Sequence, residues 1–277
     1  MLGDVNESTV RRALEEIGYK RHLIPLDIEE RFLFEVDTPI TIYDQSVMVT
    51  ADWHIPIYDP VYTNIMIEHA RRENIETLVV GGDFFNFDSL SRFDGKQADA
   101  GLERELEEGI SIMSVLCETF ENIYYIWGNH DARMHTALGQ KLKFKQTLQM
   151  IFSALDTEQY TRLTFSDLDH LWVVQDGSPN DDPWYICHPA SYNRQALTTA
   201  KQLSAIHNAN VITAHSHHCA VGYAVNGFNV VADAGGLFDF DKTAYLRRST
   251  THPRWTQGYS WLKDGKLGVS SPGWSVI

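Results

Sequence analysis

Cysteine, positive charge and long apolar runs are all scarce in this 277-residue chain. The three cysteines, Cys117, Cys187 and Cys219, are far apart and form no CxxC pair, which excludes a disulfide-stapled miniprotein and favours a reduced compartment. No stretch approaches the roughly 18 consecutive apolar residues of a membrane-spanning helix. The first residues also lack the basic and apolar regions of a secretory signal. We therefore expect a cytoplasmic protein that does not enter a membrane.

The charge balance is strongly acidic, with 23 Lys and Arg against 37 Asp and Glu and a formal net charge of −14. Long-range repulsion makes such a chain a poor general binder of DNA, RNA or anionic lipid. Residues 133–145 and 242–266 are local basic exceptions. The second stretch includes the aromatic residues Tyr245, Trp255, Tyr259 and Trp261. Such surfaces suit bases and phosphate backbones, although the same aromatics could instead pack the terminal strands.

Apolar residues make up 43% of the chain, enough for a sizeable core, and they follow a regular rhythm. The pattern predicts strands and helices in alternation over residues 45–50, 60–73, 77–80, 99–120 and 122–127. Helical sequence follows to about residue 155. This alternation is typical of an α/β fold with a largely parallel inner sheet.

The second half of the chain is richer in strands. We expect them at residues 171–174, 184–187, 210–213 and 229–232, with a helix over 193–207. We divide the chain into an N-terminal helical extension (1–40), a central domain (41–240) and a C-terminal β-hairpin extension packed on that domain (241–277). Asp264-Gly265 is the predicted hairpin turn.

Polar residues that can bind metals follow five of the predicted strands. They are Asp52 and His54, Asp83, Asn129, His188, and His215 with His217. Ligands of open α/β sheets bind beyond the carboxyl ends of the strands, so we expect these side chains to meet at one sheet edge. Imidazole and carboxylate groups together suit transition-metal ions.

The order of these motifs resembles that of the calcineurin-like metallophosphoesterase superfamily. The matching motifs are Asp52-Trp53-His54, Gly82-Asp83-Phe84-Phe85-Asn86, Gly128-Asn129-His130-Asp131, His188 and Ala214-His215-Ser216-His217. Ala214 stands where the family usually has glycine, and the segment 233–236 also departs from the usual pattern. The resemblance implies a four-layer α/β/β/α sandwich with two metal ions at the sheet edge.

The resemblance also implies which residues hold each ion. One ion would be held by Asp52, His54, Asp83 and His217. The other would be held by Asp83, Asn129, His188 and His215, so that Asp83 bridges the two. Manganese is favoured, with iron, zinc and nickel as alternatives. The implied reaction is hydrolysis of a phosphate ester, by in-line attack of a hydroxide that bridges the ions.

Four further residues are candidates for contact with the substrate or for positioning the groups that contact it. His130 would stabilise charge on the phosphoryl group or protonate the leaving oxygen. Asp131 is expected to orient His130, as carboxylates orient imidazoles in metal sites. Asn86 would fix a ligand or a water molecule. Arg133 would either reach the phosphate or lie on the surface.

These motifs predict the reaction better than they predict the substrate. We favour a phosphodiesterase that acts on nucleotides or nucleic-acid ends, including a nuclease. The alternatives are a phosphomonoesterase (nucleotidase or protein phosphatase), a non-catalytic metal-binding scaffold, and a DNA-binding regulator led by the N-terminal helix. The expected partner is a phosphate-ester substrate, with a homodimer formed through the tryptophan-rich terminal strands as a further possibility.

Overall fold

The computed structural model describes residues 37–91, 101–243, 255–272 and 274–276. The helical extension predicted over residues 1–40 lies almost entirely outside these ranges. That extension and the domain limits at 40 and 240 therefore stay predictions. Within the ranges given, none of the helices is both long enough and apolar enough to cross a membrane.

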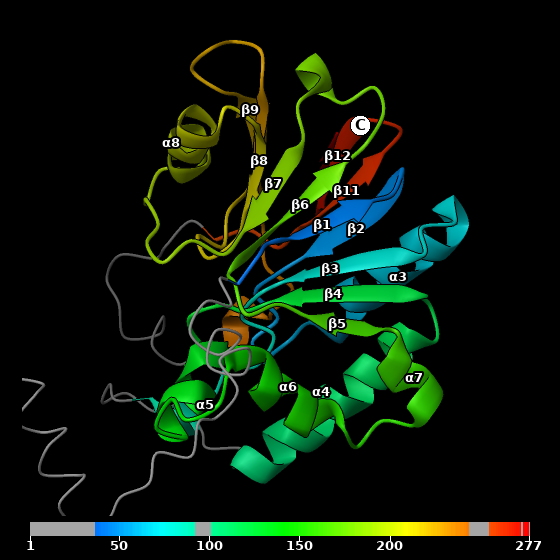
Figure 1. Cartoon of the computed structure of the whole chain (residues 1–277), viewed down its shortest axis with the longest axis vertical. Helices are drawn as coiled ribbons and strands as arrows, with labels where there is room; N and C mark the ends of the chain where they lie inside the picture. Colours follow the sequence, from blue (N-terminus) through cyan, green and yellow to red (C-terminus); the bar gives the residue numbers. More distant parts are fainter. Residues whose placement is uncertain (1–36, 92–100, 244–254, 273, 277) are drawn as a thin grey trace, which may run out of the picture. The chain divides into compact units, whose positions relative to one another are not determined.

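Two β-sheets form the centre of the fold (Figure 1). The first has the strand order β1 (Ile40–Tyr43), β6 (His170–Val174), β7 (Trp184–Cys187), β8 (Asn210–Thr213), β10 (Val230–Ala234) and β9 (Cys219–Tyr223). The second has the order β13 (Trp274–Val276), β12 (Lys266–Ser271), β11 (Tyr259–Lys263), β2 (Ser46–Thr50), β3 (Thr77–Gly81), β4 (Asn122–Ile126) and β5 (Leu163–Phe165).

The strand directions agree with the predicted parallel core. Strands β2, β3, β4 and β5 run parallel in the second sheet. Strands β7, β8 and β10 run parallel in the first sheet. Strands β11 and β12 form an antiparallel hairpin in which Lys263 pairs with Lys266, so Asp264 and Gly265 make the turn. Both turn residues have positive φ, as a two-residue hairpin of this kind requires. Because β11 also pairs with β2, the hairpin continues the second sheet.

Helices cover the outer faces of both sheets (Figure 1). They are α3 (Pro60–Glu73), α4 (Leu102–Cys117), α5 (Asp131–Ala137), α6 (Phe144–Phe152), α7 (Thr157–Thr161) and α8 (Thr198–His207). Helix α8 lies on the first sheet, and α3, α4 and α6 lie on the second. The order of layers is therefore helix, sheet, sheet, helix, as the resemblance implied.

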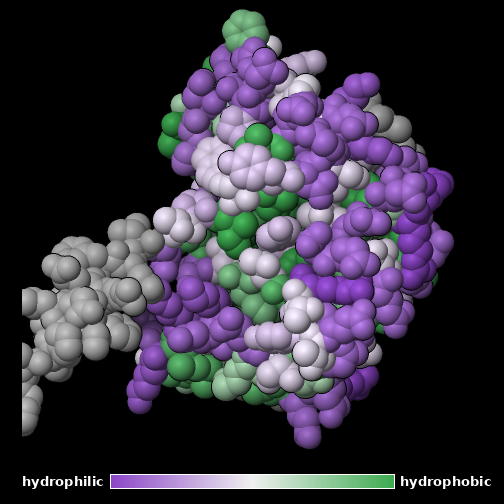
Figure 2. Space-filling view, turned by 45° about the vertical axis from the view of Figure 1, so that its right-hand side comes forward, coloured by the Kyte–Doolittle hydropathy of each residue, from purple (hydrophilic) through white to green (hydrophobic). Residues whose placement is uncertain are grey.

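Three apolar cores separate the four layers, because side chains of each strand alternate between its two faces. In β2, Val47 and Val49 enter the core between the sheets, whereas Met48 enters the core beneath α3 and α4. In β7, Trp184 enters the core between the sheets, whereas Tyr185 packs toward α8. Strands buried on both faces read as continuous apolar runs, which is why they could be predicted from sequence. Hydrophilic residues cover much of the surface seen in Figure 2, with hydrophobic residues gathered toward the middle of that view.

Candidate metal centre

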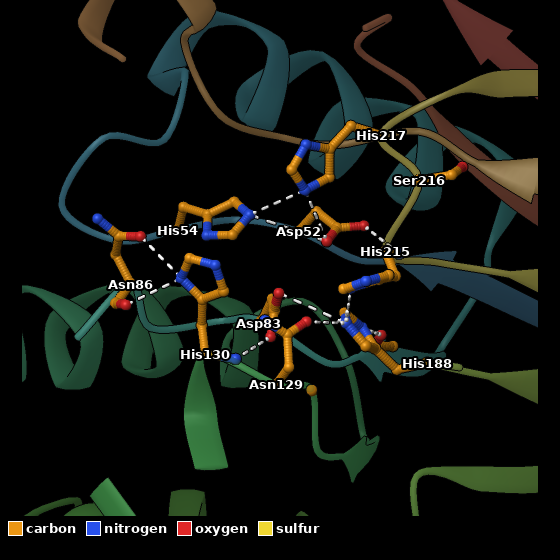
Figure 3. Close-up of polar contacts among 12 residues, drawn as sticks. Asp52, His54, Asp83, Asn86, Asn129, His130, His188, His215, Ser216 and His217 are labelled. Atoms are coloured by element: carbon orange, nitrogen blue, oxygen red, sulfur yellow. Dashed lines mark hydrogen bonds and ion pairs between the residues drawn. The ribbon is translucent and has the colours of Figure 1, made fainter. Parts of the chain in front are cut away.

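The predicted ligand residues follow strands of both sheets. Asp52, Asp83 and Asn129 come after β2, β3 and β4 of the second sheet, whereas His188 and His215 come after β7 and β8 of the first. The expectation of a single sheet edge is therefore wrong. The carboxyl ends of strands from two facing sheets converge, and the side chains meet where the sheets come together (Figure 3).

One group of ligand-capable atoms comes from Asp52, His54 and His217. His54 Nε2 lies 3.2 Å from His217 Nε2. Asp52 Oδ1 lies 3.2 Å from His217 Nε2 and 3.8 Å from His54 Nε2. The other carboxylate oxygen of Asp52 accepts the backbone N–H of His215 at 3.0 Å, which ties this group to the next.

A second group comes from Asp83, His188 and His215, with Asn129 beside them. His188 Nε2 faces Asp83 Oδ2 at 3.4 Å, Asn129 Oδ1 at 3.1 Å and His215 Nδ1 at 3.1 Å. The other ring nitrogen, His188 Nδ1, lies 3.0 Å from the Gly81 carbonyl oxygen. A backbone carbonyl at that position orients the imidazole so that Nε2 points into the group. Ser216, between His215 and His217 in the chain, points away (Figure 3).

The donor set fits bound cations. Asp52 Oδ1 is fully buried without a hydrogen-bond partner, which is costly unless a cation or a proton is bound there. His54 Nε2 and His217 Nε2 face each other at 3.2 Å, a separation that fits two ligands of one cation as well as a hydrogen bond between the rings. Atoms that bind one transition-metal ion at about 2.1 Å lie roughly 3–3.5 Å apart, similar to the separations found here.

Backbone strain is concentrated at the same residues. Positive φ angles occur at Asp52 (51°), His54 (48°), Asp83 (51°), His215 (71°) and His217 (55°). A residue other than glycine in this left-handed region costs on the order of 1–3 kcal/mol, and such strain gathers at functional sites. The chain therefore holds these turns in place against their local preference.

A close approach by the turn after β4 completes the site. At Gly128, a Cβ atom would lie 2.1 Å from Asp83 Oδ1, so only glycine lets this turn come so near. The backbone N–H of His130 then donates to the same Oδ1 at 2.7 Å. Asp83 thus has one oxygen fixed by the turn, while the other faces His188.

Charge in the cluster is shared unevenly. Burial lowers the pKa values of His54 and His215, the latter to about 4. Burial alone would lower the pKa of His188 too, but the Asp83 carboxylate, together with Asp52 and the Gly81 carbonyl oxygen, outweighs it and raises that pKa to about 10. In return, His188, together with His130 and His54, outweighs burial at Asp83 and holds the pKa of this carboxyl well below its ordinary value. Without metal, His188 is therefore the protonated histidine that balances Asp83.

His130 is oriented by Asn86 and Arg133. Its Nδ1 lies 2.9 Å from Asn86 Oδ1 and 3.0 Å from the Asn86 carbonyl oxygen. Its Nε2 lies 3.1 Å from Arg133 Nη2, and because a guanidinium only donates, Nε2 must accept. His130 is then a neutral imidazole with its proton on Nδ1, in keeping with burial, which lowers its pKa.

The prediction that Asp131 orients His130 is wrong. The Asp131 carboxylate accepts the backbone N–H groups of Gly128, Asp83 and Phe85 at 3.0, 2.8 and 3.1 Å. It also accepts the Tyr125 hydroxyl at 3.0 Å. These four bonds tie the turn after β4 to the turn after β3. Asp131 therefore holds the two turns together and makes no contact with the His130 ring that could orient it.

Replacing Asp131 by Asn is expected to lower the free energy of unfolding by about 2–4 kcal/mol, because an amide NH₂ would face backbone donors in a buried place. Tyr125→Phe removes only the hydroxyl bond and should cost about 1 kcal/mol. Denaturant unfolding of both variants measures the difference. Equal stability of Asp131→Asn and the wild type would contradict the role described here.

Arg133 lies within the site, bonded to the Asn86 carbonyl oxygen at 2.7 Å and to Asp88 at 2.8 Å.

The aromatic residues of the C-terminal basic stretch have different environments. The ring centroid of Trp255 lies 4.6 Å from that of His217, beside the candidate ligands. Tyr259 and Trp261 are 2% and 6% exposed and pack beside His69, so they belong to the core and offer no stacking surface. Tyr245 lies outside the described residues. The alternative that these aromatics pack the terminal strands is confirmed for Tyr259 and Trp261.

Comparisons with known proteins identify the family to which the chain belongs. The model of the calcineurin-like phosphoesterase family matches residues 46–275. Similar solved structures include YfcE, a phosphoesterase from E. coli (11% identity, 83% of this chain and 98% of that chain, TM-score 0.43). Others are the hypothetical protein PH1004 from Pyrococcus horikoshii (14%, 82% and 86%, 0.46) and wild-type Vps29 complexed with Zn²⁺ from Entamoeba histolytica (10%, 83% and 96%, 0.41). No curated protein matches the sequence.

Proposed function

Because the chain belongs to the calcineurin-like phosphoesterase family, we propose that it is a dimetal phosphodiesterase that acts on nucleotides or nucleic-acid ends. The observation that supports this most is the pair of ligand groups described above, which are linked by the Asp52–His215 hydrogen bond and by a third set, His54, Asp83 and His130, whose ligand atoms lie within 4.8 Å of one another. Each group offers a carboxylate and two imidazoles, with the unpartnered oxygen of Asp52 in one and the amide oxygen of Asn129 beside the other.

We assign the ligands as the family resemblance implies. Asp52, His54, Asp83 and His217 would hold one ion, and Asp83, Asn129, His188 and His215 would hold the other. We favour Mn²⁺ for both positions, since N and O ligands without thiolate suit it and the other first-row ions alike. Bound ions would supply Lewis acidity and a water molecule of lowered pKa.

The residues around these groups have separate tasks. Asp83 places negative charge between the two groups, and Asp52 adds negative charge to one of them. We propose that Arg133 supplies the positive charge that faces the phosphoryl oxygens, and that His130 positions it. His130 Nε2 accepts from Arg133, so in this arrangement His130 has no proton to give to a leaving oxygen. Of the two roles expected for His130, charge stabilisation together with Arg133 is the better supported.

The supply of positive charge favours a diester. Among the residues that the structure describes, Arg133 is the one Lys or Arg whose side chain contacts these site residues, and Asp88 already pairs with it at 2.8 Å. A phosphodiester has one negative charge, whereas a monoester approaches two at neutral pH because its second pKa is about 6. Apart from the proposed ions, the site adds one partly neutralised guanidinium, which suits the smaller charge.

The three cysteines are free and buried, which supports the proposed cytoplasmic setting.

Hydrolysis of bis-p-nitrophenyl phosphate beside p-nitrophenyl phosphate tests the proposal, with Mn²⁺ added. We expect the diester to be cleaved faster, a chelator to abolish turnover, and His130→Ala to lower kcat on the order of 100-fold through lost charge stabilisation. Cleavage of the monoester alone would favour a phosphomonoesterase instead. Stoichiometric metal binding without turnover of either ester would favour a non-catalytic scaffold.

A further inference from the structure

A half-exposed tyrosine lies against the candidate metal centre and has no part in the function proposed above. Tyr192 is in the loop between β7 and α8, and its ring centroid is 4.9 Å from that of His215, at an interplanar angle of 73°. About half of Tyr192, 49%, is exposed. An aromatic side chain in this position contacts a candidate ligand and still offers ring surface to a molecule that enters the site.

The loop that bears Tyr192 is fixed at both ends. At its start, the backbone N–H of His188 donates to the Asp169 carbonyl oxygen at 2.8 Å. At its end, the N–H of Leu197 donates to the buried carboxylate of Asp233 at 2.7 Å. Between them, the N–H of Asn193 donates to Thr199 Oγ1 at 3.1 Å. A binding residue on a braced loop loses little conformational entropy when a ligand arrives.

The same loop has an uncommitted positive charge. Arg194 is exposed, and in the part of the chain that the structure describes it has no hydrogen-bond or ion-pair partner. In a chain of net charge −14, a free guanidinium two residues from Tyr192 would attract an anionic ligand locally. Ring surface and positive charge on one loop are the features that bind nucleotides and single strands without regard to sequence.

We propose that Tyr192 stacks on the heteroaromatic base of a nucleotide whose phosphate lies at the candidate metal centre. This inference rests on the phosphodiesterase function proposed above and adds the residue that binds the base of the substrate. A nucleoside holds its base one sugar away from the phosphate. That spacing suits Tyr192, which contacts the candidate metal ligand His215 from outside the metal centre. Because every base has a π face, we expect preference for nucleosides and little preference among bases.

Two diesters with the same leaving group separate stacking from chemistry. They are p-nitrophenyl thymidine 5′-phosphate and methyl p-nitrophenyl phosphate, both assayed with Mn²⁺. Tyr192→Ala should lower kcat/KM about 5- to 100-fold for the thymidine ester and less than about twofold for the methyl ester. Tyr192→Phe keeps the ring and should behave as the wild type. Tyr43→Ala is the matched control, because Tyr43 is 79% exposed and ends β1 at the opposite end of the first sheet.

Three outcomes would overturn the inference: an equal loss for both esters, no loss for either, or a wild type that does not prefer the thymidine ester. An equal loss would mean that Tyr192 supports His215 rather than the substrate. If the wild type cleaves neither ester, the phosphodiesterase proposal fails, and stacking is then tested by itself. Calorimetry of thymidine 5′-monophosphate with the Mn²⁺-loaded chain should show affinity weakened by Tyr192→Ala and kept by Tyr192→Phe, and unchanged affinity in both would overturn it.

Discussion

Replacing Asp83 by Asn should lower kcat/KM for bis-p-nitrophenyl phosphate on the order of 1,000-fold and reduce bound Mn²⁺ from two ions to at most one per chain. Asn keeps the shape of the side chain and an oxygen that can accept the His130 N–H. It removes the negative charge that stands between the two ligand groups. Two divalent ions a few ångströms apart repel each other strongly unless a carboxylate lies between them.

Asp44→Asn is the control for this variant. Asp44 is a half-buried carboxylate just before β2, at the end of the second sheet away from the site, where it accepts the N–H of Ser46 and the hydroxyl of Thr77. Its loss should leave metal content and turnover unchanged. Metal content measured by plasma mass spectrometry, together with kinetics, compares Asp83→Asn with Asp44→Asn. Full occupancy and turnover in Asp83→Asn would contradict the bridging role.

Metal binding at pH 7 should release about one proton, and apparent affinity should rise up to about tenfold per pH unit between pH 6.5 and 9. The reason is His188, whose pKa in the metal-free chain is raised to about 10 because Asp83, Asp52 and the Gly81 carbonyl oxygen together outweigh the effect of burial. A metal ion takes the place of the proton on Nε2. His54 and His215 contribute little to this slope, because burial holds their pKa values low and they are already neutral.

Calorimetric titration of Mn²⁺ in buffers of different ionisation enthalpy measures the proton release directly. The same pKa predicts the opposite trend for the metal-free chain. A histidine whose folded pKa lies above its unfolded value stabilises the fold fully below about pH 6.5, and this contribution is lost as the pH rises toward 10. Metal affinity that does not change across this range, with no proton released, would contradict the His188–Asp83 pairing.

Much of the fold could be predicted because its signals are local. Residues 60–73 form the predicted helix since Pro60 starts it and Asp59 caps it by accepting the N–H groups of Val61 and Tyr62. Residues 184–187 and 210–213 are continuous apolar or near-apolar runs between polar ends, and they form the predicted strands. Strands β1, β5, β9 and β13 are not among the predicted strands. Strand β5 has three residues, and β9 includes Gly222 and pairs only with its hairpin neighbour, so neither of these two has a strong pattern of its own.

The site was predictable in its membership but less so in its internal contacts. The motifs identified residues that the structure does bring together, because each follows a strand end. The partners of Asp131 and His130 depend on how two turns from different strands pack, and no spacing within one turn reveals that. The place of Asn86 in the site could be predicted, because the third residue after Asp83 returns toward the turn after β4. Tyr192 had no motif, because its role depends on contact with His215 from a loop 23 residues earlier in the chain.

The central claim is that two metal ions share Asp83, and a crystal structure of the Mn²⁺-loaded chain with anomalous scattering measured at the manganese edge tests it most directly. We predict two anomalous peaks about 3.5–4 Å apart on either side of the Asp83 carboxylate. One would lie among Asp52, His54 and His217, and the other among Asn129, His188 and His215. A single peak, or peaks away from Asp83, would contradict the account.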